Sequence, residues 1–334
     1  MGLRIGALGE LGVIRLIEAM QGPLPPGAIG IGDDAAFWPA PPGALGWLIS
    51  QDMLVESQHF RWDWATPEEV GWKAAQVNLS DIAAMGGEPF AVLTSLAIPA
   101  HGTVEQVRGL YSGLTRALSA HGVPIIGGDT VGGSDRLVLD VTILGKPSPC
   151  GPVRRQGARV GDRLVVSGWL GSSYAGYLLL SEGVRTASAT PSEQYLLEAH
   201  LMPQARLSLG RMVAEHVSAM TDISDGLARE IFAMLLPGQG ADIHLDQLPI
   251  RPEVRVLAER HGADAAVWAV WGGEDYELLM AVPPEALPVI SQEARRLQVP
   301  LTEVGAVTGS GEVRWMSRGR AVRIEGDGVK FEHF

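Results

Sequence analysis

Short apolar runs alternate with longer amphipathic segments along the first half of the chain. The short runs predict strands, at residues 44–50, 90–99, 123–128 and 136–144. The longer segments repeat apolar residues at helical spacing and predict two helices, one after Thr66 and one after Thr103. The first should end near Met85, where two glycines and a proline follow, and the second before Gly122. This alternation predicts a unit of mixed α/β type.

The second half repeats the pattern after a loop-like segment rich in proline and glycine, residues 145–153. We place a domain boundary there, near residue 150, and expect one domain of residues 1–150 and a second of residues 151–334. Strands are predicted at 162–168, 241–245 and 276–282, with two more closing the chain. Helices are predicted at 172–183, from about 192 to 233, at 253–261 and at 285–298. The expected fold class is α/β, of the α+β type, with two domains.

Composition limits the class of protein. The chain has 334 residues, 46% hydrophobic and 19% charged, and can bury a large core. No apolar run reaches the roughly 18 residues that a bilayer span needs, so we expect no membrane partner and a cytoplasmic location. A net charge of −12 argues against a nucleic-acid partner, because phosphate backbones are bound by an excess of lysine and arginine. The one cysteine, Cys150, cannot form an internal disulfide or a thiolate metal cluster.

Acidic residues gather in short motifs, most of them beside glycine or serine, at the ends of predicted elements. The motifs are GIGDDAAF, ISQDML, NLSDIAAMGG, IIGGDTVGG, DISDGL and GGEDYEL. Any one of them could be an ordinary turn or helix cap, because aspartate beside glycine serves both. Together they place carboxylates where a phosphate could approach, and Mg²⁺ binds through a few carboxylates, water and phosphate oxygens. The pattern therefore indicates metal-bridged polyphosphate.

The standard nucleotide and hydrolase signatures are missing from the sequence. It contains no GxxxxGK(S/T) loop and no protein-kinase HRD and DFG pair. HExxH, GxSxG and paired CxxC motifs are also missing, so zinc proteolysis and serine hydrolysis have no support.

The run VNLSDIAAMGGEP, residues 77–89, places polar residues inside a segment otherwise suited to burial. In a helix that ends near Met85, Asn78 and Asp81 lie about one turn apart and could both face a cleft. A carboxylate near a helix C-terminus is unfavourable for the helix dipole, so a bound metal would explain Asp81 better than stability does. The alternative is a helix end with incidental polar groups and alanine and glycine packing.

The motifs GIGDDAA, DMLVESQHF, GWKAAQVNLSDIAAMGGEP, GGDT, RRQGARVGD, DISDGL, GGEDYEL and FEHF resemble, in this order, those of the thiamine-monophosphate kinases. That family belongs to the aminoimidazole ribonucleotide synthetase-like superfamily. The resemblance implies a two-domain fold and the ATP-dependent conversion of thiamine monophosphate to thiamine diphosphate. It also implies a homodimer in which two N-terminal sheets pair into a barrel, with ATP and several Mg²⁺ ions in a cleft.

The resemblance also implies roles for particular residues. The metal ligands implied are Asp34, Ser50, Gln51, Asp52, Asp81, Asp129, Asp222 and Asp225. Contacts with ATP are implied for Tyr111, Gly128, Asp129, Arg155 and Ser224, and contacts with the acceptor for His59, Glu274 and Phe331. Gln51 stands where many relatives have threonine, and Phe331 stands where relatives often carry tryptophan or tyrosine, which leaves an aromatic face without a polar group.

The implied acceptor is a phosphate monoester that is already largely ionised at neutral pH, so it needs no general base. We therefore expect direct in-line transfer by positioning and charge neutralisation, without a covalent nucleophile. Two alternatives stay open. The protein could be another ATP-using member of the superfamily, or a non-catalytic module that binds nucleotide through metal.

Overall fold

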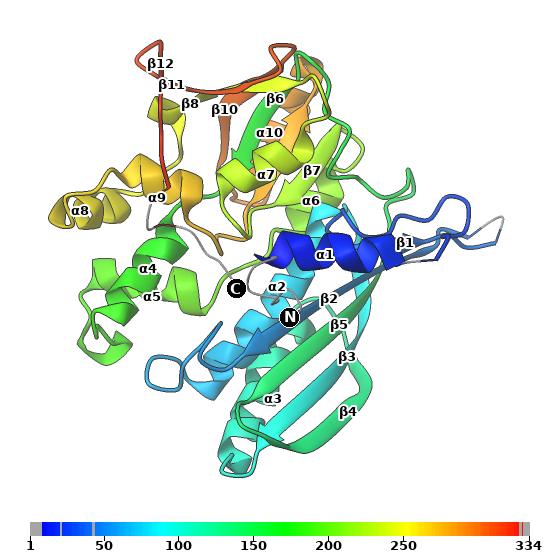
Figure 1. Ribbon diagram of the computed structural model, residues 1–334, viewed down its shortest axis with the longest axis vertical. Coiled ribbons are helices and arrows are strands. Elements are labelled where there is room, and N and C mark those ends of the chain that lie inside the picture. The colour runs from blue at the N-terminus through cyan, green and yellow to red at the C-terminus, as the bar shows by residue number, and fades with distance from the viewer. Residues whose placement is uncertain (1–8, 21, 42–43, 327–328, 330–334) are drawn as a thin grey trace, which may run out of the picture.

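The computed structural model describes residues 9–20, 22–41, 44–326 and 329. The chain forms two units, each built on its own sheet, with α2 packed between them (Figure 1). The predicted boundary near residue 150 falls in the connection between the last strand of the first sheet and the first strand of the second. Within the described residues, no helix is long and apolar enough to cross a membrane.

The first sheet has five strands in the order β1-β2-β5-β3-β4. Its strands are β1 (Ala36–Trp38), β2 (Trp47–Val55), β3 (Glu88–Pro99), β4 (Ile125–Ser134) and β5 (Val138–Lys146). The β3 and β4 strands run parallel, while the other neighbours are antiparallel. The sheet is therefore mixed, as the sequence predicts.

Two helices, α2 (Pro67–Ala84) and α3 (Val104–Ser119), pack closely together beside this sheet. Both begin with a capping box, at Thr66 and at Thr103, as the sequence indicates. Glycines allow the close approach, because a Cβ on Gly71 would lie 1.9 Å from the carbonyl oxygen of Leu110. A shorter helix, α1 (Gly9–Met20), precedes this unit.

The helices leave the other face of the first sheet open. Successive side chains along a strand point to opposite faces of the sheet. The residues that precede and follow a buried residue therefore point to the outer face. Trp47, Met53, Leu93 and Val131 are 43%, 52%, 37% and 59% exposed, respectively. Among the described residues, these four apolar side chains of the outer face are exposed to solvent.

The second sheet has seven strands in the order β12-β11-β8-β10-β6-β9-β7. Its strands are β6 (Arg163–Ser167), β7 (Ala219–Asp222), β8 (Gly240–His244), β9 (Leu278–Val282), β10 (Leu301–Thr308), β11 (Val313–Ser317) and β12 (Arg320–Val322). The helices around it are α4 (Ser172–Ser181), α5 (Pro191–Leu201), α6 (Leu207–Val213), α7 (Leu227–Met234), α8 (Pro252–Arg260), α9 (Ala265–Trp271) and α10 (Leu287–Arg296).

The second unit corrects three details of the sequence prediction. The stretch from 192 to 233 is not helical throughout, because β7 interrupts it and delivers Asp222. The helix α9 was not expected, and three strands rather than two follow α10. The β7 strand is only four residues long and wholly buried, so it shows no alternation that sequence periodicity could detect.

Candidate functional site

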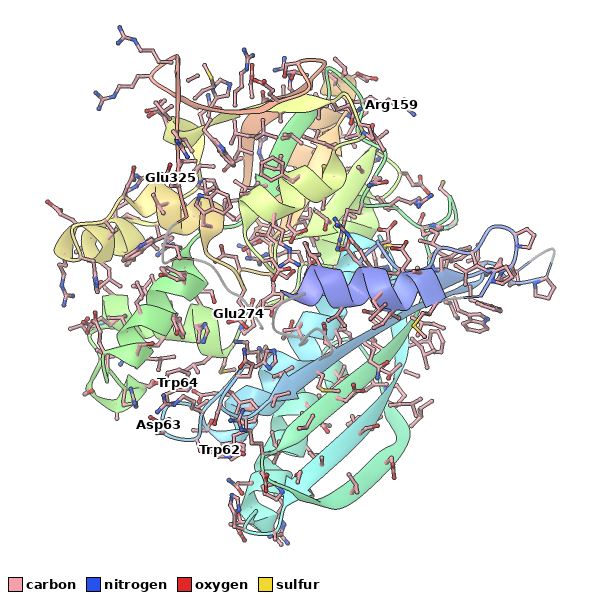
Figure 2. The ribbon with its side chains drawn as sticks, viewed as in Figure 1. Trp62, Asp63, Trp64, Arg159, Glu274 and Glu325 are labelled. Carbon is pink, nitrogen blue, oxygen red and sulfur yellow. The ribbon has the colours of Figure 1, made fainter. Side chains whose placement is uncertain are left out.

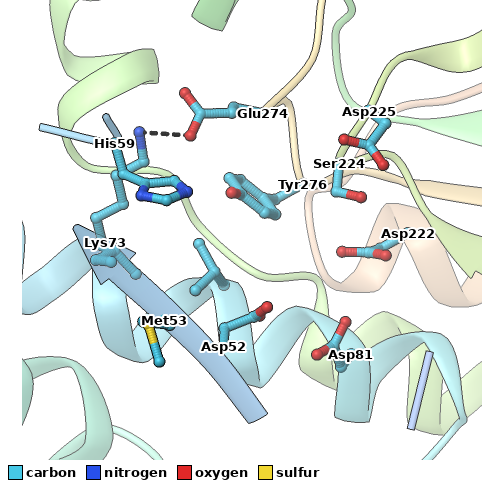
Figure 3. Close-up of a pocket in the computed structure, with 12 residues that line it drawn as sticks. Asp52, Met53, His59, Lys73, Asp81, Asp222, Ser224, Asp225, Glu274 and Tyr276 are labelled. Atoms are coloured by element: carbon cyan, nitrogen blue, oxygen red, sulfur yellow. Dashed lines mark ion pairs between the residues drawn. The ribbon is translucent and has the colours of Figure 1, made fainter. Parts of the chain in front are cut away.

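A pocket opens where the two units meet, between β2 and α2 on one side and loops of the second unit on the other. Glu274 marks this junction in Figure 2. The cavity has a volume of about 190 Å³. Its lining residues are Asp52, Met53, Leu54, His59, Lys73, Val77, Asp81, Asp222, Ser224, Asp225, Glu274 and Tyr276. Figure 3 shows aspartates toward one end and Lys73, His59 and Glu274 toward the other.

The polar residues of the NLSD run in α2 form hydrogen bonds with residues at the aspartate end of the pocket. Ser80 donates a hydrogen bond of 2.6 Å from its Oγ to Oδ2 of Asp222. Asn78 is fully buried and does not line the pocket; its Oδ1 accepts from the backbone N–H of Asp52 at 3.2 Å. Asp81 itself lines the pocket and accepts a hydrogen bond from Ser50. The run therefore supports β2 and β7, and Asp81 is its pocket-lining carboxylate.

Buried carboxylates crowd this end. Burial raises the pKa of Asp81 well above its usual value, and the charges of Asp52 and Asp222 raise it further. Burial likewise raises the pKa of Asp222 to about 8, with a further contribution from Asp34. The pKa of Asp34 is also raised by burial, against the lowering effect of Arg155. Such a group of acids is costly in a folded protein unless a cation joins it.

One carboxylate oxygen at this end is left without a partner. Asp34 accepts hydrogen bonds at Oδ1 from Arg155 and from the hydroxyl of Thr221, but its Oδ2 is buried and has no hydrogen-bond partner among the described residues. The neighbouring Glu230 is also buried, and burial raises its pKa to about 8. Buried polar atoms are normally paired, so this oxygen is a candidate ligand atom for a cation.

The two arginines of the RRQG motif lie beside this group. Arg155 binds Asp34, while Arg154 lies 3.4 Å from Asp33. Asp225 forms an ion pair of 3.1 Å with Arg229. The structure therefore brings Arg155 to the aspartate end and leaves Arg154 more exposed.

The opposite end of the pocket carries a buried ion pair. Lys73 Nζ lies 2.8 Å from Oε1 of Glu274, and Nδ1 of His200 lies 3.3 Å from Oε2 of the same carboxylate. His59 lines the pocket nearby, and its Nδ1 accepts a hydrogen bond of 3.0 Å from the backbone N–H of Val55. Sequence reasoning missed Lys73, because a lysine in a helix is usually solvated. Its place among alanines and valines in GWKAAQV was the signal available.

Some residues implied by the resemblance lie away from this pocket. Gln51 points to the outer face of the sheet and donates hydrogen bonds of 2.8 and 2.9 Å to the two carboxylate oxygens of Asp140. Asp129 and Gly128 lie on β4, which β5 and β3 separate from β2. The hydroxyl of Tyr111 lies 2.9 Å from that of Thr94 on β3.

The other residues with implied roles lie in or beside the pocket, except one that is outside the described residues. Ser224 and Asp225 line the pocket, and Ser50 lies directly beneath Asp81. Phe331 lies outside the described residues. Among those residues, no three His, Cys, Asp or Glu side chains are grouped closely enough to hold a metal ion by themselves. The roles assigned to all these residues stay predictions.

Two family models match the chain over most of its length. Residues 32–146 match the N-terminal domain of AIR synthase related proteins, and residues 159–316 match the C-terminal domain. The chain is 36% identical over 281 residues to thiamine-monophosphate kinase of Bacillus subtilis (strain 168), covering 84% of this chain and 85% of that protein. It is 35% identical over 285 residues to thiamine-monophosphate kinase of Aquifex aeolicus (strain VF5), covering 85% and 89%.

Solved structures agree with these sequence matches. The structure of AaThiL complexed with AMPPCP and TMP has a TM-score of 0.83, is 32% identical in sequence, and covers 100% of both chains. The crystal structure of thiamine-monophosphate kinase from Stenotrophomonas maltophilia K279a has a TM-score of 0.75 at 30% identity, covering 96% of this chain and 99% of that one. The two-domain fold expected from the sequence is thereby confirmed. This chain belongs to the thiamine-monophosphate kinase family, within the AIR synthase related proteins.

Proposed function

We propose that the protein transfers the γ-phosphoryl group of ATP to thiamine monophosphate, forming thiamine diphosphate and ADP. The observation that carries this proposal is the polarised pocket between the two units, with buried aspartates at one end and a buried carboxylate at the other. A relative of the same fold, AaThiL, was solved in complex with AMPPCP, an ATP analogue, and TMP. The two ends of the pocket suit the two substrates of such a complex.

The aspartate end fits Mg²⁺. The unpaired Oδ2 of Asp34 and the raised pKa values of Asp81 and Asp222 fit a site that binds divalent cations. Mg²⁺ commonly takes only one or two carboxylates and completes its shell with water and phosphate oxygens, so a preformed group of three ligands is unnecessary. We assign Asp34, Asp52, Asp81 and Asp222 as the principal Mg²⁺ ligands. Ser50 and Asp225 lie beside them. When bound, the ions would neutralise the charge of the phosphates.

The remaining residues at this end position the nucleotide. Arg155 lies within reach of the same carboxylates and can exchange Asp34 for a phosphate oxygen, because a guanidinium binds either anion through paired N–H donors. Ser224 offers a hydroxyl at the edge of the pocket. No residue at this end needs to act as a general base, because the acceptor phosphate is largely ionised at neutral pH. The contribution of the chain is alignment and charge neutralisation, which is how phosphoryl transfer is generally catalysed.

The acceptor end holds the organic part of thiamine monophosphate. The Glu274 side chain is 15% exposed and ionised: burial raises its pKa, but the charge of Lys73 and its hydrogen bond lower it by more, so that the net pKa lies below the usual value. An ionised carboxylate accepts hydrogen bonds and complements the aminopyrimidine and thiazolium of the acceptor. His59, on the same side of the pocket, would contact the acceptor as well.

We also propose a homodimer formed through the outer face of the first sheet. That face exposes Trp47, Met53, Leu93 and Val131, and an apolar sheet face of this kind needs cover. Gln51 lies on β2 and Asp129 on β4, with β5 and β3 between them, and both residues are on or beside this outer face. We therefore propose that their implied roles depend on the dimer. The cytoplasm, where ATP is available, is the proposed location.

The experiment is a product assay on the purified protein. ATP, MgCl₂ and thiamine monophosphate are incubated with it, and ADP and thiamine diphosphate are quantified by chromatography. Equal amounts of both products, dependent on metal and acceptor, are expected. Nucleotide binding without turnover would support a sensor instead, and ATP consumption without thiamine diphosphate would support another reaction of the superfamily.

A further inference from the structure

Lys73 is a buried lysine in the middle of α2, and its side chain is only 6% exposed. Its ammonium lies 2.8 Å from Glu274, which is itself buried, so the pair joins the first unit to the 272–277 loop of the second. Buried ion pairs are expensive to desolvate and often add no net stability. The pair therefore needs an explanation other than holding the two units together.

His200 also lies beside the Glu274 carboxylate. Burial, with a further contribution from the charge of Lys73, lowers the pKa of His200 to about 3, so the ring is neutral. Its Nδ1 lies 3.3 Å from Oε2 of Glu274 and 3.1 Å from Oγ of Ser173. Of these two contacts, the one with Ser173 is a hydrogen bond, whereas the neutral ring lies close to the Glu274 carboxylate without a hydrogen bond to it. Lys73 therefore approaches Oε1 and His200 approaches Oε2, and an ionised carboxylate can accept further hydrogen bonds from a ligand.

The backbone around Glu274 is held in an uncommon conformation. Glu274 and Tyr276 both have positive φ angles, of 63° and 50°. The backbone N–H of Glu274 donates a hydrogen bond of 2.6 Å to the carbonyl of Ser224, which fixes the loop against the nucleotide end of the pocket. Asp275 turns away and accepts a hydrogen bond of 2.8 Å from the backbone N–H of Gly171. Strained backbone of this kind persists where the surrounding structure fixes it, and it is concentrated at functional sites.

We infer that Lys73 is a positioning residue for the acceptor: it holds the Glu274 carboxylate ionised and oriented, with His200 behind it, so that it accepts a hydrogen bond from the aminopyrimidine of thiamine monophosphate. This inference rests on the proposed function. Because Lys73 cancels the charge of Glu274 locally, the carboxylate acts as a set of hydrogen-bond acceptors more than as net charge. The pair should therefore select for the exocyclic amino group of the pyrimidine.

The test compares Lys73→Met, Glu274→Gln and the double variant with the wild-type protein. Lys146→Met is the matched control, because Lys146 lies at the exposed end of β5 over the ring of Phe90. Michaelis constants are measured for ATP and for thiamine monophosphate. The same constants are measured for the acceptor analogue in which oxygen replaces the pyrimidine amino group. Acceptor affinity is also measured by titration calorimetry, which does not require turnover.

Lys73→Met should raise the Michaelis constant for thiamine monophosphate roughly 10- to 100-fold, as expected for one hydrogen bond to a charged group, and leave that for ATP within about twofold. The wild-type protein should prefer thiamine monophosphate to the analogue, and this preference should shrink in the variant. The double variant should be no worse than Glu274→Gln alone, because Lys73 acts through Glu274. It should also recover the thermal stability that Lys73→Met loses by leaving Glu274 unpaired, without recovering acceptor affinity.

Three results would overturn the inference. They are a folded Lys73→Met protein with unchanged acceptor constants, equal effects on ATP and acceptor, and a double variant whose acceptor defect exceeds that of Glu274→Gln by a further tenfold or so. If Lys73→Met does not fold, the double variant decides the question by the last comparison. A wild-type protein that binds thiamine monophosphate without phosphorylating it would contradict the proposed function and still test Lys73 through calorimetry.

Discussion

Replacing Asp222 with asparagine should stabilise the metal-free protein and nearly abolish its activity. Asp222 is 3% exposed at the end of β7 and accepts a hydrogen bond of 2.6 Å from Ser80, which the amide oxygen of asparagine can also accept. The substitution therefore keeps the shape and removes one charge from a crowded group. In the absence of Mg²⁺, that charge is a cost to the folded state.

The size of the effect follows from the pKa of Asp222, which is raised from 3.8 to about 8 by burial first and by Asp34 next. The folded state binds the proton more tightly than the unfolded state, so the stability from this carboxyl is fully present below pH 3.8 and is lost as the pH rises to about 8. Each pH unit in that window corresponds to about 1.4 kcal/mol, which sets a ceiling of about 6 kcal/mol. We expect about 2 to 4 kcal/mol at pH 8, because the neighbouring carboxylates take up part of the change.

The assay is chemical unfolding in EDTA at several pH values between 4 and 8, repeated at saturating MgCl₂. The stabilisation by Asp222→Asn should grow with pH in EDTA. It should shrink or reverse with Mg²⁺, because ions that bind the folded wild-type protein stabilise it by mass action and the variant has lost a ligand. Asp162→Asn is the control: Asp162 is buried beside β6, where it accepts a hydrogen bond of 2.8 Å from the backbone N–H of Arg159. Figure 2 shows Arg159 on the second unit, well away from Glu274.

The control should lose stability by an amount that does not depend on Mg²⁺. A variant Asp222→Asn that is less stable than wild type at pH 8 in EDTA would refute the view that this group is an electrostatic cost. If MgCl₂ changes the stability of neither the wild-type protein nor Asp222→Asn, the assignment of the aspartate end as the metal site is refuted.

Three further outcomes are expected. Asp81→Asn should lower turnover by about a hundredfold or more at saturating MgCl₂ while circular dichroism stays unchanged, because it removes one electrostatic stabiliser; near-normal turnover would contradict its role. Sedimentation at micromolar concentration should show a homodimer, and replacing Leu93 on the outer sheet face with aspartate should dissociate it; a wild-type monomer would argue against the proposed interface. Acid quenching after incubation with γ-labelled ATP and no acceptor should leave the protein unlabelled, and a stoichiometric label on the chain would mean a covalent intermediate.

The parts of the fold that could be predicted from the sequence are those with strong local signals. The capping boxes at Thr66 and Thr103 are present in the structure, and α2 ends one residue before Met85. The β7 strand and α9 were missed for a common reason. Both are short and almost entirely apolar or buried, so neither shows the alternation or the amphipathic period on which prediction depends.

The candidate site likewise contains residues that the sequence could predict and residues that it could not. Six aspartates were implied as metal ligands by the resemblance. Four of them, Asp52, Asp81, Asp222 and Asp225, line one pocket, whereas Asp129 lies away from it on β4. The function of the neighbouring polar residues could not be deduced, because Asn78 supports the backbone of β2 and Ser80 supports Asp222 across the boundary between the two units. Such contacts depend on tertiary packing. The same holds for Lys73, whose partner lies about 200 residues further along the chain.

The central claim is direct transfer of the γ-phosphoryl group of ATP to the phosphate of thiamine monophosphate. The most direct measurement uses γ-labelled ATP with MgCl₂, thiamine monophosphate and catalytic amounts of the protein, and follows the label by chromatography. The account predicts that the label enters the terminal phosphate of thiamine diphosphate in a one-to-one ratio with ADP. Label released as inorganic phosphate, with no thiamine diphosphate formed, would contradict it.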